Sequence, residues 1–395
     1  MSRMTIPPEA RLVKPKLIGY DPTRPKRWLE ILAYGGLFTA LWALVVFTYG
    51  LVPTFFRARG LLDSTLGFLA YAVVEALLAF GLAALVALVL IVVLRKYLGK
   101  VQERVGPMHY GPAGAFQTVF DALKLLGKEV FAPKKVDPLV FWLAPAIVFV
   151  STFMLMVVLP VAPGWRIAEL DVGLLYVVAV STLGAYGVLL GGLSHGNKWG
   201  LLGGFRAGAQ LVSYEIPLAI AILSVGVFSG SLSFSGVVAH QAGLWHVVPL
   251  FLSFVVYLVA SIAELKATPF DLPEAESEIV AGYNTEYSGM SFAFFFLAEF
   301  VELFLLPGFM VLLFFGGWHG PLFGLDTQSF AAQLLQSLYF LLKVAVWVWI
   351  FLWIRATLPR FRDDQLMDLA WKGLLPLSLV GLLVAALLRM FLEVL

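Results

Sequence analysis

Long apolar stretches alternate with short polar ones along the whole chain. An α-helix needs about 20 apolar residues to cross a bilayer, and nine runs approach that length. Their spacing predicts an all-α polytopic membrane protein with about nine transmembrane helices. The runs fall at residues 28–52, 68–94, 139–162, 174–193, 210–229, 246–263, 291–316, 330–354 and 374–392.

The composition agrees with this pattern. Of 395 residues, 61% are hydrophobic and only 13% are charged, an apolar excess that a soluble core of this size does not need. The absence of cysteine excludes disulfides, thiolate zinc sites and iron–sulfur clusters ligated by this chain. The five histidines show no metal-ligand spacing.

Basic residues are divided unequally between the two sets of loops that nine spans create. One set, which includes the residues before the first run, holds 22 of the 27 lysines and arginines. The other set holds Arg57, Arg59, Arg166 and Arg389, while Lys343 lies inside the eighth run. Because cytoplasmic loops collect basic residues, we expect a cytoplasmic N-terminus and a retained basic leader over residues 1–27.

An amphipathic helix is expected between the second and third runs, over residues 111–129. Phe116, Phe120 and Leu123 recur there at helical spacing, and Asp121 lies on or near the polar side. Two interpretations stay open. The helix either lies among lipid headgroups, or it covers a cavity or docks a partner.

The segment after the sixth run is exceptionally acidic. Within residues 264–286 there are six carboxylates and one cation, Lys266. Carboxylates this close repel one another and favour proton uptake near neutral pH. Apolar neighbours such as Phe270 and Ile279 indicate that the segment folds back onto the membrane domain. The six acids are Glu264, Asp271, Glu274, Glu276, Glu278 and Glu286.

Four further acids within or at the edge of predicted spans need a reason, and Glu75, near the outer start of the second, is expected to be interfacial. Glu215 stands near the start of the fifth, where it either caps a helix or carries protons. Glu299 and Glu302 lie three residues apart inside the seventh, on one helical face, and should not both be ionised there. They form either a structural pair or a proton-transfer site. Lys343 is the candidate counter-ion.

Four blocks together resemble the family of the H subunit of respiratory complex I (NADH-quinone oxidoreductase), the membrane component that forms the quinone chamber. They contain FQTVFDALKLLGKE, LLGGFRAGAQLVSYEIPL, TPFDLPEAESE with GYNTEY, and WIRATLPRFRDDQL. The blocks occur in order, at residues 95–129, 198–218, 263–286 and 353–376.

The resemblance implies an eight-helix core over residues 68–395 with its acidic loop at 264–290, preceded by an extra helix and loop over residues 28–67. It also implies a subunit of a proton-translocating NADH:quinone oxidoreductase in the cell (inner or plasma) membrane, not catalytic alone and without a metal of its own. Quinone is then the substrate. FMN and iron–sulfur clusters belong to soluble partner subunits on the cytoplasmic face, and antiporter-like membrane subunits are further partners.

The resemblance also implies roles for individual residues. Proton transfer is expected of Glu215, Glu264 and Glu299, to which the residue pattern adds Glu302 and Lys343. The quinone chamber and its coupling loop are expected to involve Arg95, Gln102, Arg104, Asp121, Arg206, Asp271, Glu274, Glu276, Glu278 and Glu286.

The chain departs from the family at two positions, since Leu94 and Thr182 stand where relatives often carry acids. Glu302 is an added acid that could substitute for one of them. Other functions stay open: a ferredoxin-fed quinone reductase, the membrane anchor of a related hydrogenase, or an independent proton- or cation-coupled transporter. The absence of a recognisable inverted repeat argues against the transporter. The electron donor, the type of quinone and the pumping stoichiometry stay open as well.

Overall fold

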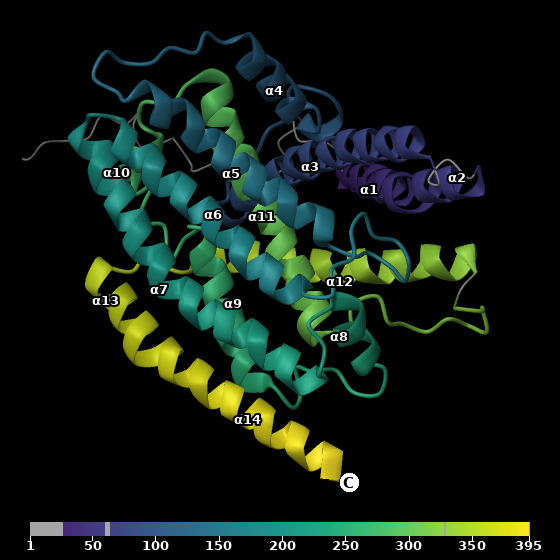
Figure 1. The fold of residues 1–395 in the computed structure, drawn as a ribbon. Coiled ribbons are helices and arrows are strands. Elements are labelled where there is room, and N and C mark those ends of the chain that lie inside the picture. Colours follow the sequence, from purple (N-terminus) through teal and green to yellow (C-terminus); the bar gives the residue numbers. More distant parts are fainter. Residues whose placement is uncertain (1–26, 60–63, 328, 395) are drawn as a thin grey trace, which may run out of the picture.

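The computed structural model describes residues 27–59, 64–327 and 329–394. This described part is helical and has one isolated β-bridge, between Ala162 and Trp165 (Figure 1). The predicted leader at residues 1–27 lies outside it except for Arg27. The longer helices are α1 (Arg27–Val45), α3 (Thr65–Val101), α4 (Gln117–Gly127), α5 (Pro138–Val158), α6 (Gly173–Ser194), α7 (Lys198–Ser229), α9 (Phe251–Glu264), α11 (Gly289–Phe314), α12 (Phe330–Thr357) and α14 (Leu375–Val394).

Short elements join or extend these helices. Two π-helical turns continue the helices beside them, η2 after α1 and η6 before α14. Two 3₁₀ turns, η4 and η5, lie in loops. The short elements are η2 (Val46–Leu51), α2 (Val52–Ala58), η4 (Pro112–Gly114), α8 (Phe234–His240), α10 (Glu276–Ile279), η5 (Gly282–Asn284), α13 (Asp363–Asp368) and η6 (Leu369–Leu374).

Eight helices of the described part are long and apolar enough to cross a membrane, which confirms the all-α polytopic fold. The sixth predicted span differs from expectation. Residues 246–250 form turns, so α9 has only 14 helical residues and rises about 21 Å. The predicted amphipathic helix divides into η4 and α4, because Ala113 has a positive φ of 55° that breaks the helix.

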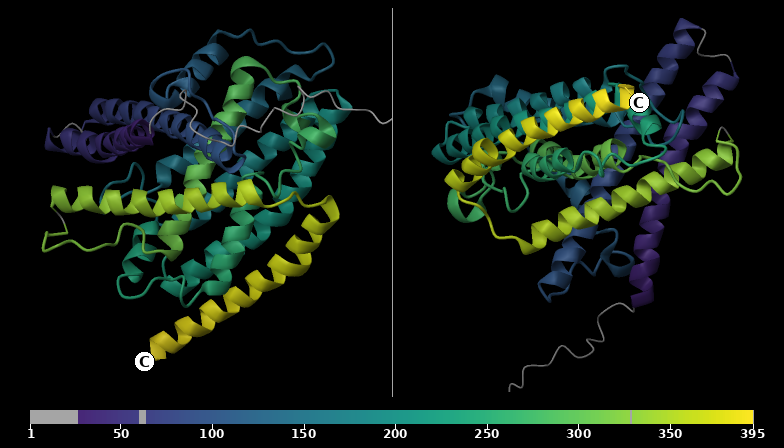
Figure 2. Two further views of the ribbon diagram at one scale, coloured as in Figure 1. Left: turned by 180° about the vertical axis from the view of Figure 1, so that it is seen from behind. Right: turned by 90° about the horizontal axis from the view of Figure 1, so that it is seen from below.

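Helices α5, α6 and α7 lie side by side, and α14 runs along α7 (Figure 1). Helix α11 crosses behind this layer and is the most buried of the long helices. Helices α1 and α3 lie next to each other at one edge of the molecule (Figure 2).

The closest helix contact, between α6 and α7, depends on glycine. A Cβ atom on Gly192 would lie 2.4 Å from the Cα atom of Gly204, so only glycine allows the two backbones to approach this closely. Gly203 approaches the acidic loop in the same way, since a Cβ atom there would lie 2.6 Å from the Cα atom of Gly282. These contacts fix the loop against α7.

One end of the molecule carries three loops. We call this end the charged face; the loops are residues 102–137, 265–288 and 358–362. The backbone N–H of Phe361 donates to the Pro269 carbonyl at 3.0 Å. The backbone N–H of Asp137 donates to the Ser194 carbonyl at 3.1 Å. Segments distant in sequence therefore meet at this face.

Candidate functional site

The acidic loop is tied to α7 and to the segment just beyond α12. Gln210 of α7 donates its side-chain amide to the carbonyls of Ala263 and Phe270, each at 2.8 Å. Arg360, just beyond α12, pairs with Asp271 at 2.9 Å. The loop therefore packs against the helices at the charged face, as its apolar residues predict.

Glu274 is the carboxylate held most firmly within the loop. It accepts hydrogen bonds from the Tyr283 hydroxyl at 2.5 Å and from the Asn284 amide at 2.9 Å. Burial, reinforced by the charge of Glu299, raises the pKa of Glu274 to about 7. Burial also raises the pKa of Asp271, although the Arg360 guanidinium opposes it. Glu274 can thus exchange a proton near neutral pH.

Helices α7, α9 and α11 bring three acids together deeper in the molecule. Glu264, at the end of α9, is 7% exposed and interacts electrostatically with Glu215 of α7 and Glu302 of α11. Thr152 of α5 donates its hydroxyl to Glu302 at 2.8 Å. These contacts join residues that are far apart in the sequence.

Glu299 connects the deep acids to the loop. It pairs with Arg355 of α12 at 3.0 Å, and it interacts electrostatically with Glu302, Asp271 and Glu274. The carboxylates therefore form a continuous series from the charged face into the helices. We call this series the acid row; it comprises Glu274, Asp271, Glu299, Glu302, Glu264 and Glu215.

Sequence reasoning missed the central cation of this row. Lys266 interacts electrostatically with Glu215, Glu264, Glu274 and Glu302, and its positive φ of 52° sets the direction of the chain just after α9. Its isolation among six acids was the available signal. The partners Arg355 and Arg360 were missed too, because their pairing depends on how the end of α12 packs.

The expected pairing of Lys343 with Glu299 and Glu302 is wrong. The Lys343 ammonium donates to the carbonyls of Phe315, Gly317 and His319 at 2.8–3.0 Å. Those carbonyls follow the far end of α11, and the partner of Glu299 is Arg355 instead.

Arg206 bridges two further elements of the charged face. It contacts Glu278 of α10 at 2.7 Å and Asp363 of α13 at 3.3 Å. Nearby, Asn197 donates to Glu286 at 2.9 Å. The side chain of Glu276 lies outside the described part.

A second polar group occupies the end of α3 and the start of α4. Arg95 pairs with Asp121, which also accepts from Gln117 at 3.2 Å, and Arg104 donates to Gln102 at 2.6 Å. Among the residues the structure describes, no ion pair or hydrogen bond joins this group to the acid row. The predicted chamber residues Arg95, Gln102, Arg104 and Asp121 thus stand apart from the acid row.

The two family departures have different surroundings. Thr182 of α6 lies next to Glu215, and its hydroxyl interacts with that carboxylate. Leu94 is buried in the hydrophobic core. Thr182 therefore keeps a polar group beside the acid row, whereas Leu94 does not.

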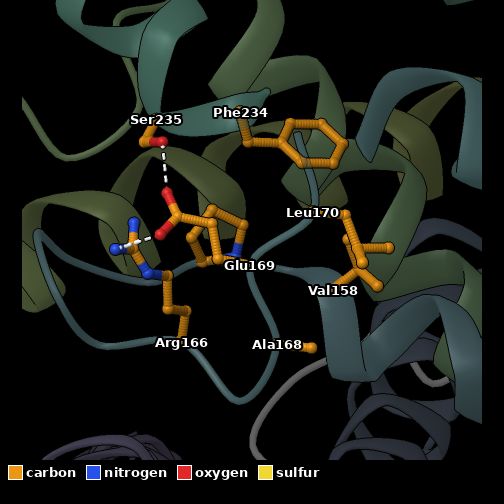
Figure 3. A pocket seen from close by; sticks show the side chains of 8 residues that line it. Val158, Arg166, Ala168, Glu169, Leu170, Phe234 and Ser235 are labelled. Carbon is orange, nitrogen blue, oxygen red and sulfur yellow. Dashed lines mark hydrogen bonds and ion pairs between the residues drawn. The ribbon is translucent and has the colours of Figure 1, made fainter. Parts of the chain in front are cut away.

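A small recess on the opposite side of the molecule carries no comparable chemistry. Glu169 pairs there with Arg166 and accepts from Ser235 at 2.7 Å (Figure 3). Its cavity volume of about 10 Å³ is at most enough for one water molecule. Within the described residues, no three acids or histidines are placed to hold a metal ion.

Comparison with known proteins gives a consistent result. The NADH dehydrogenase family profile matches residues 74–386. The H subunit of the NADH-quinone oxidoreductase of Geobacillus kaustophilus is 46% identical over 325 residues, covering 82% of this chain and 93% of the relative. Its counterpart in Bacillus cytotoxicus is 46% identical over 296 residues, covering 75% of this chain and 87% of the relative. That of Geobacillus thermodenitrificans is 45% identical over 318 residues, covering 78% and 94%. The chain therefore belongs to the NADH dehydrogenase family, among the H subunits of NADH-quinone oxidoreductase, which are membrane components of complex I.

Proposed function

We propose that this chain forms part of the quinone chamber of a proton-translocating NADH:quinone oxidoreductase and couples quinone reduction to proton translocation. The acid row carries this proposal. It begins in a loop at the charged face and continues through α11 and α9 to Glu215. A membrane protein retains costly buried acids mainly where protons or ions move.

The acid row fits the coupling of a charge change to proton movement. Each acid interacts with a neighbouring acid, so gain of a proton by one alters the proton affinity of the next. Lys266 and Arg355 supply fixed positive charge along the row. Reduction of a quinone consumes protons at the charged face, and Glu274, with a pKa of about 7, is suited to respond to that demand.

The proposal includes an orientation and partners. The charged face is cytoplasmic and receives the soluble subunits that hold FMN and iron–sulfur clusters, while antiporter-like subunits lie beside the helices. The N-terminus is cytoplasmic, and the membrane is the cell's plasma membrane. NADH is the electron donor favoured, because the relatives are named NADH-quinone oxidoreductases. Residues 68–395 form the core, and the helix before them is an addition.

Replacement of Arg206 by methionine in the intact complex tests the quinone chamber. Loss of the guanidinium breaks the bridge between Glu278 and Asp363, so we expect quinone turnover to fall several-fold. Electron transfer from NADH to a water-soluble artificial acceptor should stay unchanged, because it does not use this chain. Arg362→Met is the matched control, since Arg362 is exposed and pairs locally with Asp364.

The outcomes separate clearly. Unchanged quinone turnover in Arg206→Met would contradict the proposed chamber. Equal loss of both activities would show instead that the complex has failed to assemble.

A further inference from the structure

Glu75 is a buried acid that the acid row does not use. It lies in α3, is 2% exposed, and precedes Arg95 by 20 residues, or about 30 Å along the helix. Since Arg95 lies at the charged-face end of α3, Glu75 lies in the opposite half of the molecule. An ionisable residue at such a depth marks a functional site by default.

Glu75 does not serve as a structural tie within the described part of the chain. Neither carboxylate oxygen has a well-formed hydrogen bond, and no described cation pairs with it. Tyr71, one turn earlier, is the neighbour whose hydroxyl interacts with it. Tyr49 interacts electrostatically with the acid, but its hydroxyl donates to the Met156 carbonyl at 3.3 Å. A carboxyl group retained only for packing would normally be paired or fully hydrogen-bonded.

Tyr49 belongs to the π-turn η2, which packs against α3 beside Glu75. π-turns inside helices are frequent at functional sites. Gly50 presses against the Trp165 ring, where a Cβ atom would lie 2.7 Å from the nearest ring carbon. Thr48, in the same turn, is fully buried, and its hydroxyl has no partner among the described residues.

Helix α12 adds another unsatisfied oxygen near this junction. Trp42 of α1 donates to Ser337 of α12 at 3.2 Å. The adjacent Gln336 is 4% exposed, and its side-chain oxygen has no partner within the described chain. Helices α1, α3 and α12 pack together here. Buried polar atoms of this kind are normally satisfied by ordered water or an ion.

We propose that Glu75 is a proton-binding site in the half of the membrane opposite the acid row, beside η2 and connected to solvent by water at Thr48 and Gln336. An uncompensated carboxylate is strongly unfavourable in this apolar setting. Transfer of one proton from hydronium gives the neutral acid and one water, and removes that charge. The family profile begins at residue 74, so the η2 segment beside Glu75 lies outside the matched region.

Infrared difference spectroscopy of the intact complex in lipid tests this site. The carbonyl stretch of a protonated carboxyl group should be present in the wild-type spectrum at neutral pH and absent in Glu75→Gln. It should shift on transfer from H₂O to D₂O as the acid proton exchanges. Glu169→Gln, which alters an acid that is already held in an ion pair with Arg166, should retain the band.

Two results would overturn the proposal: identical carbonyl spectra for wild type and Glu75→Gln, or a band that does not shift after prolonged exposure to D₂O. If the complex with Glu75→Gln fails to assemble, Glu75→Asp is the second test. Its carbonyl band should lie at a different frequency from that of the wild type and should still shift in D₂O. Thr48→Val and Gln336→Leu should slow the exchange several-fold, and unaltered exchange in both would eliminate the water connection. None of these readouts depends on quinone turnover, so they stand apart from the proposed coupling function.

Discussion

At the scale of single residues, the sequence identifies the acids better than their partners. Glu215, Glu264 and Glu299 were expected to take part from the family resemblance, and Glu302 from its place on one helical face with Glu299. Their arrangement depends on contacts across the fold: Arg355 reaches Glu299 from 56 positions away. Periodicity within one helix cannot reveal such a partner, which explains why Lys343 was wrongly chosen.

The ion pair of Glu299 with Arg355 can be measured by a double-mutant cycle. Glu299→Gln leaves a largely buried arginine without its partner, so we expect a loss of about 1.5–3 kcal/mol in stability and reduced quinone turnover. Arg355→Gln should have a similar effect. The double variant should be less damaged than the sum of the two, because each single change leaves a charge unpaired. Thermal unfolding and turnover of all three variants provide the comparison, and strict additivity would rule out the pair.

Glu274 predicts a pH dependence of the loop. Its pKa rises from 4.5 to about 7 on folding, so its contribution is greatest below pH 4.5 and is lost as pH increases through 7. The expected loss is on the order of 2–3 kcal/mol. Hydrogen exchange of residues 270–287, corrected for the intrinsic rate, should therefore accelerate between pH 5 and 8. In Glu274→Gln this acceleration should disappear; its persistence would assign the effect to another group.

At the scale of elements, apolar runs predicted most helices to within a few residues, but α7 begins at Lys198, well before the predicted run at 210–229. The exceptions have local causes. The turns at 246–250 shorten α9; Val247, Val248 and Leu250 continue the apolar run through them, so hydrophobicity alone does not reveal the turns. The π-turns η2 and η6 leave no mark in hydrophobic spacing. The glycine contact between α6 and α7 could be suspected from sequence, but its closeness is visible only in the fold.

Gly192→Ala should disturb the crossing of α6 and α7. The new methyl group would meet the Gly204 backbone at 2.4 Å, and backbone cannot move aside as a flexible side chain can. We expect a destabilisation of about 1–3 kcal/mol, read as a lower unfolding temperature in detergent. Gly81→Ala is the matched control, because nothing lies within 4 Å of its added Cβ atom. Equal stability of the two variants would refute the close contact.

At the scale of the whole molecule, the two faces differ in the charged side chains that they carry. Arg206, Arg355 and Arg360 pair with the acids of the charged face, whereas the opposite face holds small loops and the recess at Glu169. The sequence predicted this polarity from the positions of its basic residues. It could not predict that Arg95, Gln102, Arg104 and Asp121 stand apart from the acid row.

The orientation can be checked by labelling, since the chain has no native cysteine. Cysteines introduced singly at Ser64 and Ser235 should react with an impermeant reagent from outside the cell. A cysteine at Ser2, which lies outside the described residues, should react only in inverted vesicles. Labelling of position 2 from outside would reverse the proposed topology.

The central claim is that the acid row carries the coupling between quinone reduction and proton translocation. Its most direct test is simultaneous measurement of proton transport and quinone reduction in proteoliposomes containing Glu264→Gln, with Glu169→Gln as the control. Glu264 links Glu215 to Glu302, so proton transport should fall several-fold, with quinone turnover falling alongside it if the two processes are tightly coupled. Electron transfer to an artificial acceptor should persist. Full proton transport at full quinone turnover in Glu264→Gln would contradict the account.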